Sequence, residues 1–187
     1  REQVSWEQVQ IFWGDERCVP LTDERSNYGM AEQTLLSQVP IPRENIHRVQ
    51  GELPAEEAAE EYEARLRAHF SGEMPVFELI LLGLGSDAHT ASLFPHSPVL
   101  KEKERWVAAV PAAGGELARV TFTVPLINNA QRVLFMVSGA DKADALWQVL
   151  RGKTDHERYP AQAIHPEKEA PVWLVDQAAA RRLGEAG

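Results

Sequence analysis

Three short polar clusters hold the side chains best suited to chemistry in this sequence. In chain order they are Asp15-Glu16-Arg17, Asp87-Ala88-His89 and Gly139-Ala140-Asp141-Lys142. A histidine beside carboxylates can act as a general base, while arginine and lysine side chains can hold an anion. The residue types therefore indicate a site that combines proton transfer with the binding of a negatively charged group.

The clusters lie where predicted strands end. Apolar runs over residues 9–13, 79–82 and 132–137 predict strands, and one polar cluster follows each of them. In open α/β sheets, ligands bind at the carboxyl ends of the parallel strands. We therefore expect the three clusters to share one rim of a sheet.

The cluster that follows residues 79–82 has the most specific pattern. Its apolar run is typical of a strand buried on both faces in a parallel sheet. Gly83 and Gly85 then allow a sharp turn and a close approach of the backbone to another group. Asp87 suits the start of a short helix, which would place His89 in the first helical turn. A helix start favours the neutral imidazole that a general base needs.

Each of these residues also has a simpler interpretation. His89 could be a structural histidine, and Lys142 could be an exposed surface lysine. Asp15 and Arg17 could form a local ion pair that ties a loop. The stretch 83–88 also satisfies the dinucleotide fingerprint Gly-x-Gly-x-x-Ala. A proline soon ends the helix predicted behind that stretch, so we interpret the fingerprint as a coincidence.

The remaining reactive residue types do not indicate a second kind of site. The other histidines lack the spacing of metal ligands, so we interpret them as structural or surface residues. They are His47, His69, His96, His156 and His165. Cys18 has no strong base beside it in the sequence, which favours a core position over a nucleophile. The chain has no Gly-x-Ser-x-Gly elbow, which argues against a serine hydrolase.

Predicted strands alternate with predicted helices along the whole chain. Further strands are expected at residues 46–49, 106–110, 119–124 and 172–175, and helices at 26–39, 54–70, 140–150 and 176–183. Ser26 and Asp176 are the expected N-caps of two of these helices. This alternation predicts an α/β fold with a mainly parallel sheet, organised as one domain over residues 1–187.

Composition limits the classes of partner. The net charge of −9 argues against a nucleic-acid-binding protein, which would need a basic surface. The chain is 44% hydrophobic and has no apolar run long enough to cross a membrane. Its single cysteine suits a reducing compartment, so we expect a cytoplasmic protein. The sequence leaves open whether that protein is a monomer or a homodimer.

Two motifs resemble the glucosamine-6-phosphate isomerase/6-phosphogluconolactonase superfamily. The first is Phe12-Trp-Gly-Asp-Glu-Arg17-Cys-Val-Pro20 with Ser26-Asn27-Tyr28, and the second runs from Leu82 through Asp87-Ala-His89 to Pro95. Related deaminases carry a tyrosine where Arg17 stands and Phe-Asn-Glu-Pro where this chain has Ser92-Leu-Phe-Pro95. The resemblance therefore favours the lactonase branch.

The resemblance implies a fold and a set of roles. The fold would be a three-layer α/β/α sandwich, with no metal and no organic cofactor. The histidine that matches His89 would activate water, and the positions that match Asp15, Arg17 and Lys142 would line the substrate site. For the oxyanion we expect backbone amides near Gly85–Ala88, joined by Arg17 if that side chain does not bind the phosphate. Asp87 or Asp15 would orient the imidazole or the sugar hydroxyls.

The implied reaction is the hydrolysis of 6-phosphoglucono-1,5-lactone to 6-phosphogluconate in the pentose phosphate pathway. Its partner is a small phosphorylated sugar lactone, whose phosphate we expect on Arg17 and Lys142. One alternative is a sugar-phosphate isomerase or deaminase of the same superfamily. Another is a non-catalytic relic that only binds sugar phosphates.

Two features depart from the family pattern. Members normally begin with a strand and helix joined by a Gly-Gly-Ser/Thr-x-Pro loop, whereas this sequence opens almost directly on a predicted strand. The family also usually has glycine where Ala88 stands. If φ is positive at Ala88, the turn that presents His89 carries strain of roughly 1–2 kcal/mol.

Overall fold

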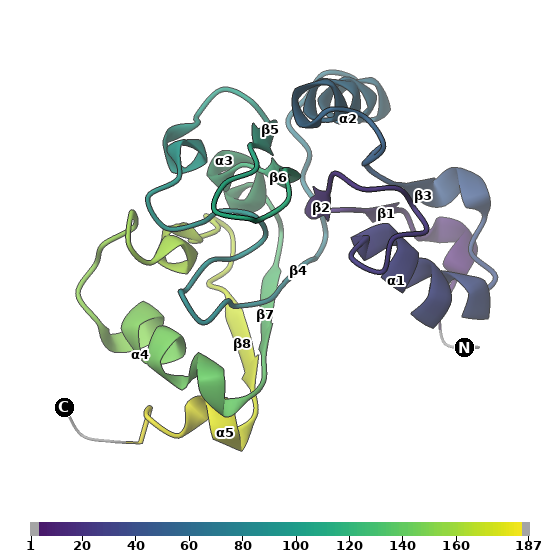
Figure 1. Ribbon diagram of the computed structural model, residues 1–187. Helices are drawn as coiled ribbons and strands as arrows, with labels where there is room; N and C mark the ends of the chain where they lie inside the picture. Colours follow the sequence, from purple (N-terminus) through teal and green to yellow (C-terminus); the bar gives the residue numbers. More distant parts are fainter. Residues whose placement is uncertain (1–3, 185–187) are drawn as a thin grey trace. The chain divides into compact units, whose positions relative to one another are not determined.

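A computed structural model describes residues 4–184, which form two compact units. The first unit comprises residues 4–65 and 107–121, and the second comprises residues 66–106 and 122–184. Both contain helices and strands (Figure 1). Three of the four strand ladders described here are parallel, and one is antiparallel. The prediction of an α/β fold with a mainly parallel sheet is therefore confirmed.

The first unit contains two small sheets. Strand β1 (Ile11–Phe12) pairs in parallel with β3 (Ile46–His47). Strand β2 (Asp15–Arg17) pairs antiparallel with β6 (Arg119–Phe122), which in turn neighbours β5 (Val107–Val110). Sequence patterning predicted a polar loop at residues 14–17, and that prediction is wrong for the three residues of β2 because pairing with β6 supplies their backbone partners.

Helices of the first unit follow the predicted signals closely. Helix α1 (Asn27–Thr34) begins at Ser26, whose Oγ accepts a hydrogen bond of 3.0 Å from the Gly29 amide, so the predicted cap is confirmed. Short 3₁₀ turns surround it at Trp6–Gln8, Leu36–Gln38 and Arg43–Asn45. Helix α2 (Ala55–His69) matches the prediction at 54–70 to within one residue at each end and continues into the second unit.

A buried tyrosine of α2 ties together the ends of β1 and β3. The Tyr62 hydroxyl accepts from the Trp13 amide at 2.9 Å and lies 3.1 Å from the His47 carbonyl. Tyr62 is fully buried, and this burial raises the pKa of its hydroxyl. The segment that leads into β2 is therefore anchored to the helix.

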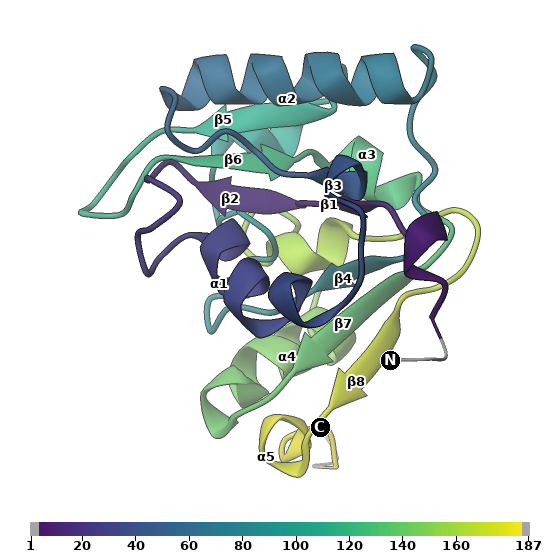
Figure 2. The ribbon, with the colours of Figure 1, turned by 90° about the vertical axis from the view of Figure 1, so that its right-hand side faces the viewer.

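The second unit is built on one parallel sheet. Its strands are β4 (Ile80–Leu82), β7 (Val133–Val137) and β8 (Val172–Val175), in that order, and they lie side by side in Figure 2. Phe135 of β7 is fully buried and stacks on Trp173 of β8 with ring centroids 3.9 Å apart. The sheet was predicted to be buried on both faces at β4, but Leu81 is 59% exposed, so only one face of that strand is buried.

The helices of the second unit are short. They are α3 (Val124–Asn128), α4 (Ala143–Arg151) and α5 (Gln177–Ala180), with 3₁₀ turns at Pro98–Lys101, Ala140–Lys142 and Pro160–Ala163. Helix α3 was not predicted, and α4 begins only after the 3₁₀ turn that precedes it. Asp176 caps α5 as predicted, because its Oδ1 accepts from the Ala179 amide at 2.7 Å. Leu150, near the end of α4, is 37% exposed.

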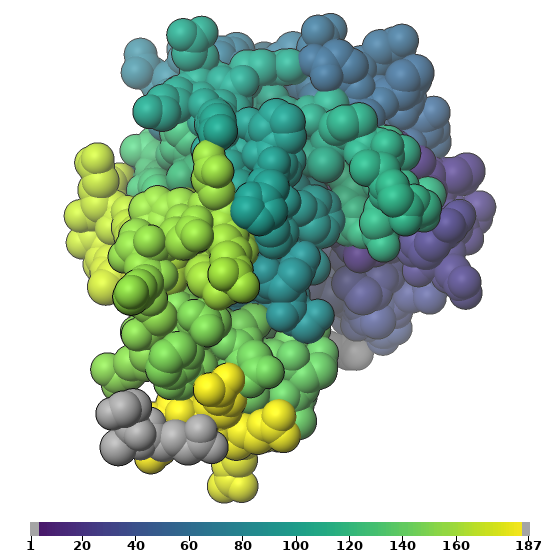
Figure 3. Space-filling model, turned by 60° about the vertical axis from the view of Figure 1, so that its left-hand side comes forward, coloured from purple at the N-terminus to yellow at the C-terminus, as the bar shows by residue number. Residues whose placement is uncertain are grey.

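The long segment between β4 and η4 (Pro98–Lys101) packs against a distant part of the same unit. The Ala161 amide donates to the Ala88 carbonyl at 3.1 Å, and the His96 amide donates to the Glu157 carbonyl at 2.7 Å. In the space-filling view, the teal atoms of this segment border yellow-green atoms of the later chain (Figure 3). These contacts hold the segment that carries His89 against the body of the unit.

Candidate functional site

A tight turn follows β4 and carries His89. The Ala88 amide donates to the Gly85 carbonyl at 3.0 Å, and the Gly85 amide donates to the His89 carbonyl at 2.8 Å. The Thr90 hydroxyl donates to the Gly83 carbonyl at 2.8 Å. The turn is therefore closed on itself by three hydrogen bonds.

The helix predicted to begin near Asp87 does not form. Turns and an isolated bridge between Thr90 and Leu93 occupy its place. Ala88 and Ala91 have positive φ values of 67° and 48°, which a right-handed helix cannot contain. His89 therefore does not lie at a helix start, and the electrostatic help expected from a helix does not apply to its imidazole.

His89 and Asp87 form a direct pair. Nδ1 of His89 lies 2.6 Å from Oδ1 of Asp87, which also accepts from the His89 backbone amide at 3.1 Å. With the carboxylate as acceptor, Nδ1 carries the hydrogen and Nε2 keeps its lone pair. The imidazole packs on the Phe94 ring, 4.7 Å between centroids, and is 32% exposed. This arrangement presents a basic nitrogen from an oriented ring.

Asp87 stays ionised in this setting. Its partial burial favours the neutral acid, but the hydrogen bonds from the backbone amide and the ring of His89 outweigh that effect and lower the pKa of Asp87. A lowered pKa means that the pairing is present at neutral pH and is lost as the pH falls through the folded-state pKa. The carboxylate is therefore available to orient the ring wherever a neutral imidazole could act as a base.

Gly85 makes room for the pair. A Cβ atom at this position would lie 2.1 Å from Nδ1 of His89 and 2.6 Å from Oδ1 of Asp87. Both values are far below van der Waals contact, so the imidazole occupies the space that a side chain would need. Gly85 was predicted to bring the backbone close to another group, and the His89 ring is the group that lies there.

Ala88 holds a left-handed backbone conformation, which favours glycine. Its φ is 67°, and its side chain is completely buried. The left-handed conformation costs a non-glycine residue about 1–2 kcal/mol. The strain that was expected if φ is positive at Ala88 is thus present in the turn.

Substitutions at Ala88 separate strain from packing. We expect Ala88→Gly to change the free energy of unfolding by no more than about 1 kcal/mol, because relief of strain offsets the lost methyl burial and the added chain entropy. We expect Ala88→Val to destabilise by about 2 kcal/mol or more, since a β-branched residue is disfavoured at positive φ and overpacks a filled site. Urea titration measures both values. Equal effects of the two substitutions would contradict this interpretation.

Lys142 lies on the loop that follows β7. Its Nζ pairs with Oδ2 of Asp141 at 2.9 Å, and its side chain is 26% exposed. The hydrogen bond from Lys142 lowers the pKa of Asp141. Gly139 opens this loop with φ of 100°, and its amide donates to Oδ2 of Asp176 at 3.0 Å. The ammonium is thus held at a defined turn rather than on a free helix surface.

The loops that carry His89 and Lys142 leave the same edge of the second unit's sheet. Strands β4 and β7 are parallel, with Leu82 opposite Phe135, and each loop follows the carboxyl end of its strand. Asp176, which holds the Gly139 amide, follows the carboxyl end of β8. The predicted common rim is therefore present for two of the three clusters.

The third cluster lies in the first unit, on β2. Asp15 accepts a hydrogen bond of 3.2 Å from the Asn27 side chain at Oδ1. Arg17 donates from Nη1 to the Arg25 carbonyl at 2.5 Å, and its Nε is buried with no acceptor among residues 4–184. Both side chains thus contact the segment 25–27, which leads into α1.

Glu16 has a structural role that the sequence did not indicate. Its carboxylate is buried and accepts from the amides of Asn27 and Tyr28, each at 2.7 Å, and from the Arg17 amide at 2.8 Å. Two of these donors are orphan amides at the start of α1, where negative charge is favoured. Glu16 therefore fixes β2 against α1, and with it the position of Arg17.

Arg119 is a second residue that sequence reasoning did not single out. It lies directly opposite Arg17 in the β2–β6 ladder, and it pairs with Glu116 at 3.0 Å. Its side chain is 13% exposed. The alternating pattern of residues 119–124 predicted the strand, but the partner of that strand, and hence this neighbour of Arg17, follows only from tertiary pairing.

Residues 4–184 contain neither a metal-binding cluster nor a membrane-spanning helix. No group of three or more histidine, cysteine, aspartate or glutamate side chains among residues 4–184 could hold a metal ion. None of the helices in this part of the chain is long and apolar enough to span a membrane. Burial raises the pKa of the Cys18 thiol, which reduces its reactivity as a nucleophile.

Known proteins share both this sequence pattern and this fold. The 6-phosphogluconolactonase of Synechocystis sp. is 43% identical over 187 residues, which covers 98% of this chain and 77% of the relative. The human 6-phosphogluconolactonase is 42% identical over 171 residues, covering 90% of this chain and 66% of the relative. The chain thus spans between about two thirds and three quarters of these relatives.

Solved structures give the same result for the fold. The 6-phosphogluconolactonase of Thermotoga maritima superimposes with a TM-score of 0.79 at 32% identity, covering 92% of this chain and 74% of that one. A monomeric glucosamine-6-phosphate deaminase is similar in fold, with a TM-score of 0.80, at only 19% identity over 96% of this chain and 77% of its own. A family model described as glucosamine-6-phosphate isomerases/6-phosphogluconolactonase matches residues 1–173. The chain belongs to the glucosamine-6-phosphate isomerase/6-phosphogluconolactonase family.

Proposed function

We propose that this protein hydrolyses 6-phosphoglucono-1,5-lactone to 6-phosphogluconate, the lactone-opening step of the pentose phosphate pathway. Relatives named 6-phosphogluconolactonase, at 43% and 42% identity, support this assignment. The single observation that carries the chemistry is the 2.6 Å pair between His89 and Asp87. We take residues 1–187 to work as one lactonase domain, in the cytoplasm, as a monomer or a homodimer.

His89 is the general base in this proposal. Its Nε2 takes a proton from a water molecule as the water oxygen attacks the lactone carbonyl, while Asp87 holds the ring in the required tautomer. The protonated imidazole then gives that proton to the ring oxygen as its bond to the carbonyl carbon breaks. Water is thereby added across the ester bond, and the products are a carboxylic acid and a hydroxyl group on one molecule.

Backbone amides of the His89 turn are proposed to bind the oxyanion. The Gly85 and Ala88 amides are already used inside the turn. No hydrogen bond joins the amides of Ser86 or Asp87 to another residue of the described chain, which leaves both available as donors. We assign the oxyanion to these two amides, since fixed donors of this kind stabilise the charge that develops during attack.

Arg17 and Lys142 are proposed to bind the substrate phosphate, and Asp15 to bind sugar hydroxyls. The buried, unsatisfied Nε of Arg17 supports an anionic partner for that side chain. Lys142 is held by Asp141 alone in the described contacts, so an incoming phosphate can share or replace that partner. Each role is a proposal for one side chain.

The function is tested by lactone consumption measured against spontaneous opening. The expected result is a rate proportional to protein concentration, with release of one acid equivalent per lactone. The runner-up function, an isomerase or deaminase, predicts release of ammonia from glucosamine 6-phosphate instead. Binding of 6-phosphogluconate without turnover of either substrate would support the non-catalytic alternative.

A Lys142 variant tests the phosphate assignment. We expect Lys142→Ala to raise KM for the phosphorylated lactone about tenfold with little change in kcat, because the ammonium contacts the phosphate equally in the ground and transition states. Glucono-1,5-lactone, which lacks the phosphate, is the matched substrate, and its hydrolysis should be unaffected by the substitution. A loss confined to kcat would remove Lys142 from the phosphate site.

A further inference from the structure

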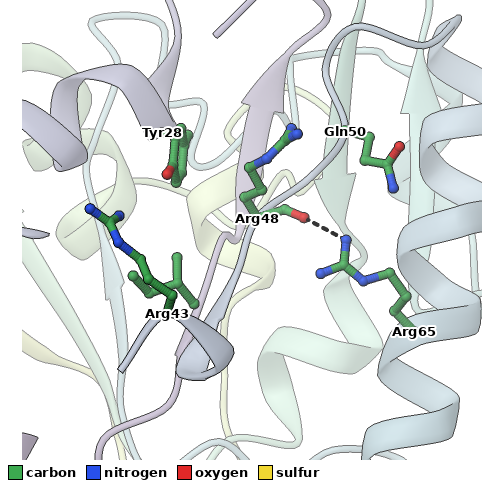
Figure 4. A pocket seen from close by; sticks show the side chains of 6 residues that line it. Tyr28, Arg43, Arg48, Gln50 and Arg65 are labelled. Carbon is green, nitrogen blue, oxygen red and sulfur yellow. Dashed lines mark hydrogen bonds between the residues drawn. The ribbon is translucent and has the colours of Figure 1, made fainter. Parts of the chain in front are cut away.

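A pocket in the first unit gathers three arginine side chains (Figure 4). Its volume is about 190 Å³, and it is lined by Tyr28, Arg43, Ile46, Arg48, Gln50 and Arg65. No lining residue is acidic, although the chain as a whole carries a formal charge of −9. We propose that this pocket binds a small molecule through its phosphomonoester group. Its lining does not include Arg17 or Lys142, which are assigned to the phosphate of the lactone.

The three guanidinium groups come from different elements. Arg43 belongs to the 3₁₀ turn before β3, Arg48 follows β3, and Arg65 projects from α2. In the view of Figure 4, Arg48 lies between Arg43 on one side and Arg65 on the other. Sites assembled from several elements hold their groups in place, because each backbone is fixed by its own packing.

Arg43 is fixed by a bidentate pair. Its Nη1 and Nη2 donate to the two oxygens of Glu32 at 2.7 and 2.8 Å, and the Tyr28 hydroxyl donates to the same carboxylate at 3.1 Å. Hydrogen bonding from Arg43 lowers the pKa of Glu32, which therefore stays ionised. Arg43 thus places a fixed guanidinium group in one wall of the pocket. Its Nε is not bonded to Glu32.

Arg48 and Arg65 use only part of their hydrogen-bonding capacity. Arg48 donates from Nη1 to Glu52 at 2.9 Å, and Arg65 donates from Nη1 to the Arg48 carbonyl at 3.2 Å. The contact of Arg65 with Glu61 is long, at 3.4 Å. In the described residues, no protein acceptor is bonded to Nε or Nη2 of either arginine. Four N–H-bearing nitrogens are therefore available to a ligand.

The carboxylates around the pocket do not cancel its preference for an anion. The pairs of Arg48 with Glu52 and of Arg65 with Glu61 are both partly exposed. Exposed ion pairs of this kind contribute little free energy, so each guanidinium can turn toward a ligand at small cost. Arg43 keeps its bidentate pair with Glu32, and the pocket therefore offers the unused guanidinium N–H groups of Arg48 and Arg65 to an anion.

The geometry favours a phosphomonoester over a carboxylate. A phosphomonoester carries nearly two charges and three terminal oxygens, whereas a carboxylate carries one charge and two oxygens. Planar guanidinium forks match phosphate oxygens in bidentate fashion, and two such forks have unused donors here. The Arg48 guanidinium carbon lies over the Tyr28 ring, 5.7 Å from its centroid, a cation–π contact that orients this arginine.

Calorimetric titration of the whole chain with inorganic phosphate tests the proposal. We expect saturable binding that weakens at least tenfold in the double variant Arg48→Gln/Arg65→Gln, because each lost fork removes charge-assisted hydrogen bonds. Arg132→Gln is the matched control, since Arg132 is an exposed arginine paired with Glu169, and its binding curve should equal that of the wild type. Circular dichroism establishes that the variants are folded.

Further arms keep the test decisive. Because Lys142 is assigned to the substrate phosphate, Lys142→Ala is titrated as well, and binding at the arginine pocket should persist in it. If the double variant does not fold, Arg48→Lys replaces it and should bind phosphate several-fold more weakly. No binding to the wild type, equal binding to the double variant or Arg48→Lys, or loss of all binding in Lys142→Ala would overturn the proposal. None of these measurements requires lactone turnover.

Discussion

Replacement of His89 by alanine is expected to lower kcat for the lactone by about 10²- to 10⁴-fold, the range that general-base catalysis supplies. The imidazole offers a basic nitrogen, Nε2, on a ring whose Nδ1 lies 2.6 Å from Oδ1 of Asp87. Removing it leaves water without an acceptor for its proton. Initial rates, corrected for spontaneous opening of the lactone, measure the loss.

The control for this variant is another histidine of the same unit. His156 is exposed and makes no contact with the His89 turn in the described residues, so His156→Gln should keep the wild-type rate. His89→Gln preserves side-chain volume better than alanine and should be nearly as inactive. A His89→Ala protein with unchanged kcat, in a preparation whose wild type is active, would assign the base to another group.

The second large effect is expected from a single methyl group at Gly85. A Cβ atom there would lie 2.1 Å from the His89 ring, so Gly85→Ala must push the imidazole out of its position. Misplacement of a catalytic group by about 1 Å costs roughly 10² in rate, and we expect kcat to fall by at least that factor. The imidazole and Asp87 are only partly buried, so the turn can adjust and the protein should remain folded.

Gly83 provides the matched control for Gly85. It lies two residues earlier in the same segment, and a Cβ atom added there would meet nothing within 4 Å. Gly83→Ala should therefore retain the activity and thermal stability of the wild type. An equal loss of kcat in the two variants would mean that the segment is sensitive to any substitution, and that the clash with His89 is not the cause.

Local signals predicted much of this fold correctly. Ser26 and the helix over residues 54–70 were predicted from capping chemistry and apolar periodicity, and both are present. Asp176 was likewise identified as a cap from its position after an apolar strand. These features depend on residues within one or two turns of one another, which is the range over which sequence patterns are informative.

The errors arose where distant contacts decide the backbone. Asp15–Arg17 is polar and forms a strand only because β6, about a hundred residues later, supplies its hydrogen-bonding partners. The helix predicted after Asp87 is replaced by turns in which Ala88 has positive φ, and the Ala88 carbonyl is bonded to the Ala161 amide. Neither constraint is visible in the residues nearby. The expected rim was found for His89 and Lys142, because parallel strands place their following loops at one edge.

Asp87 and His89 are separated by a single residue, so the base and the group that orients it are assembled locally. Bringing them together closes almost no loop, and the entropy penalty of that closure is correspondingly small. The proposed base and its carboxylate therefore lie on one short piece of chain, while the distant contact between Ala161 and Ala88 holds the turn that carries them.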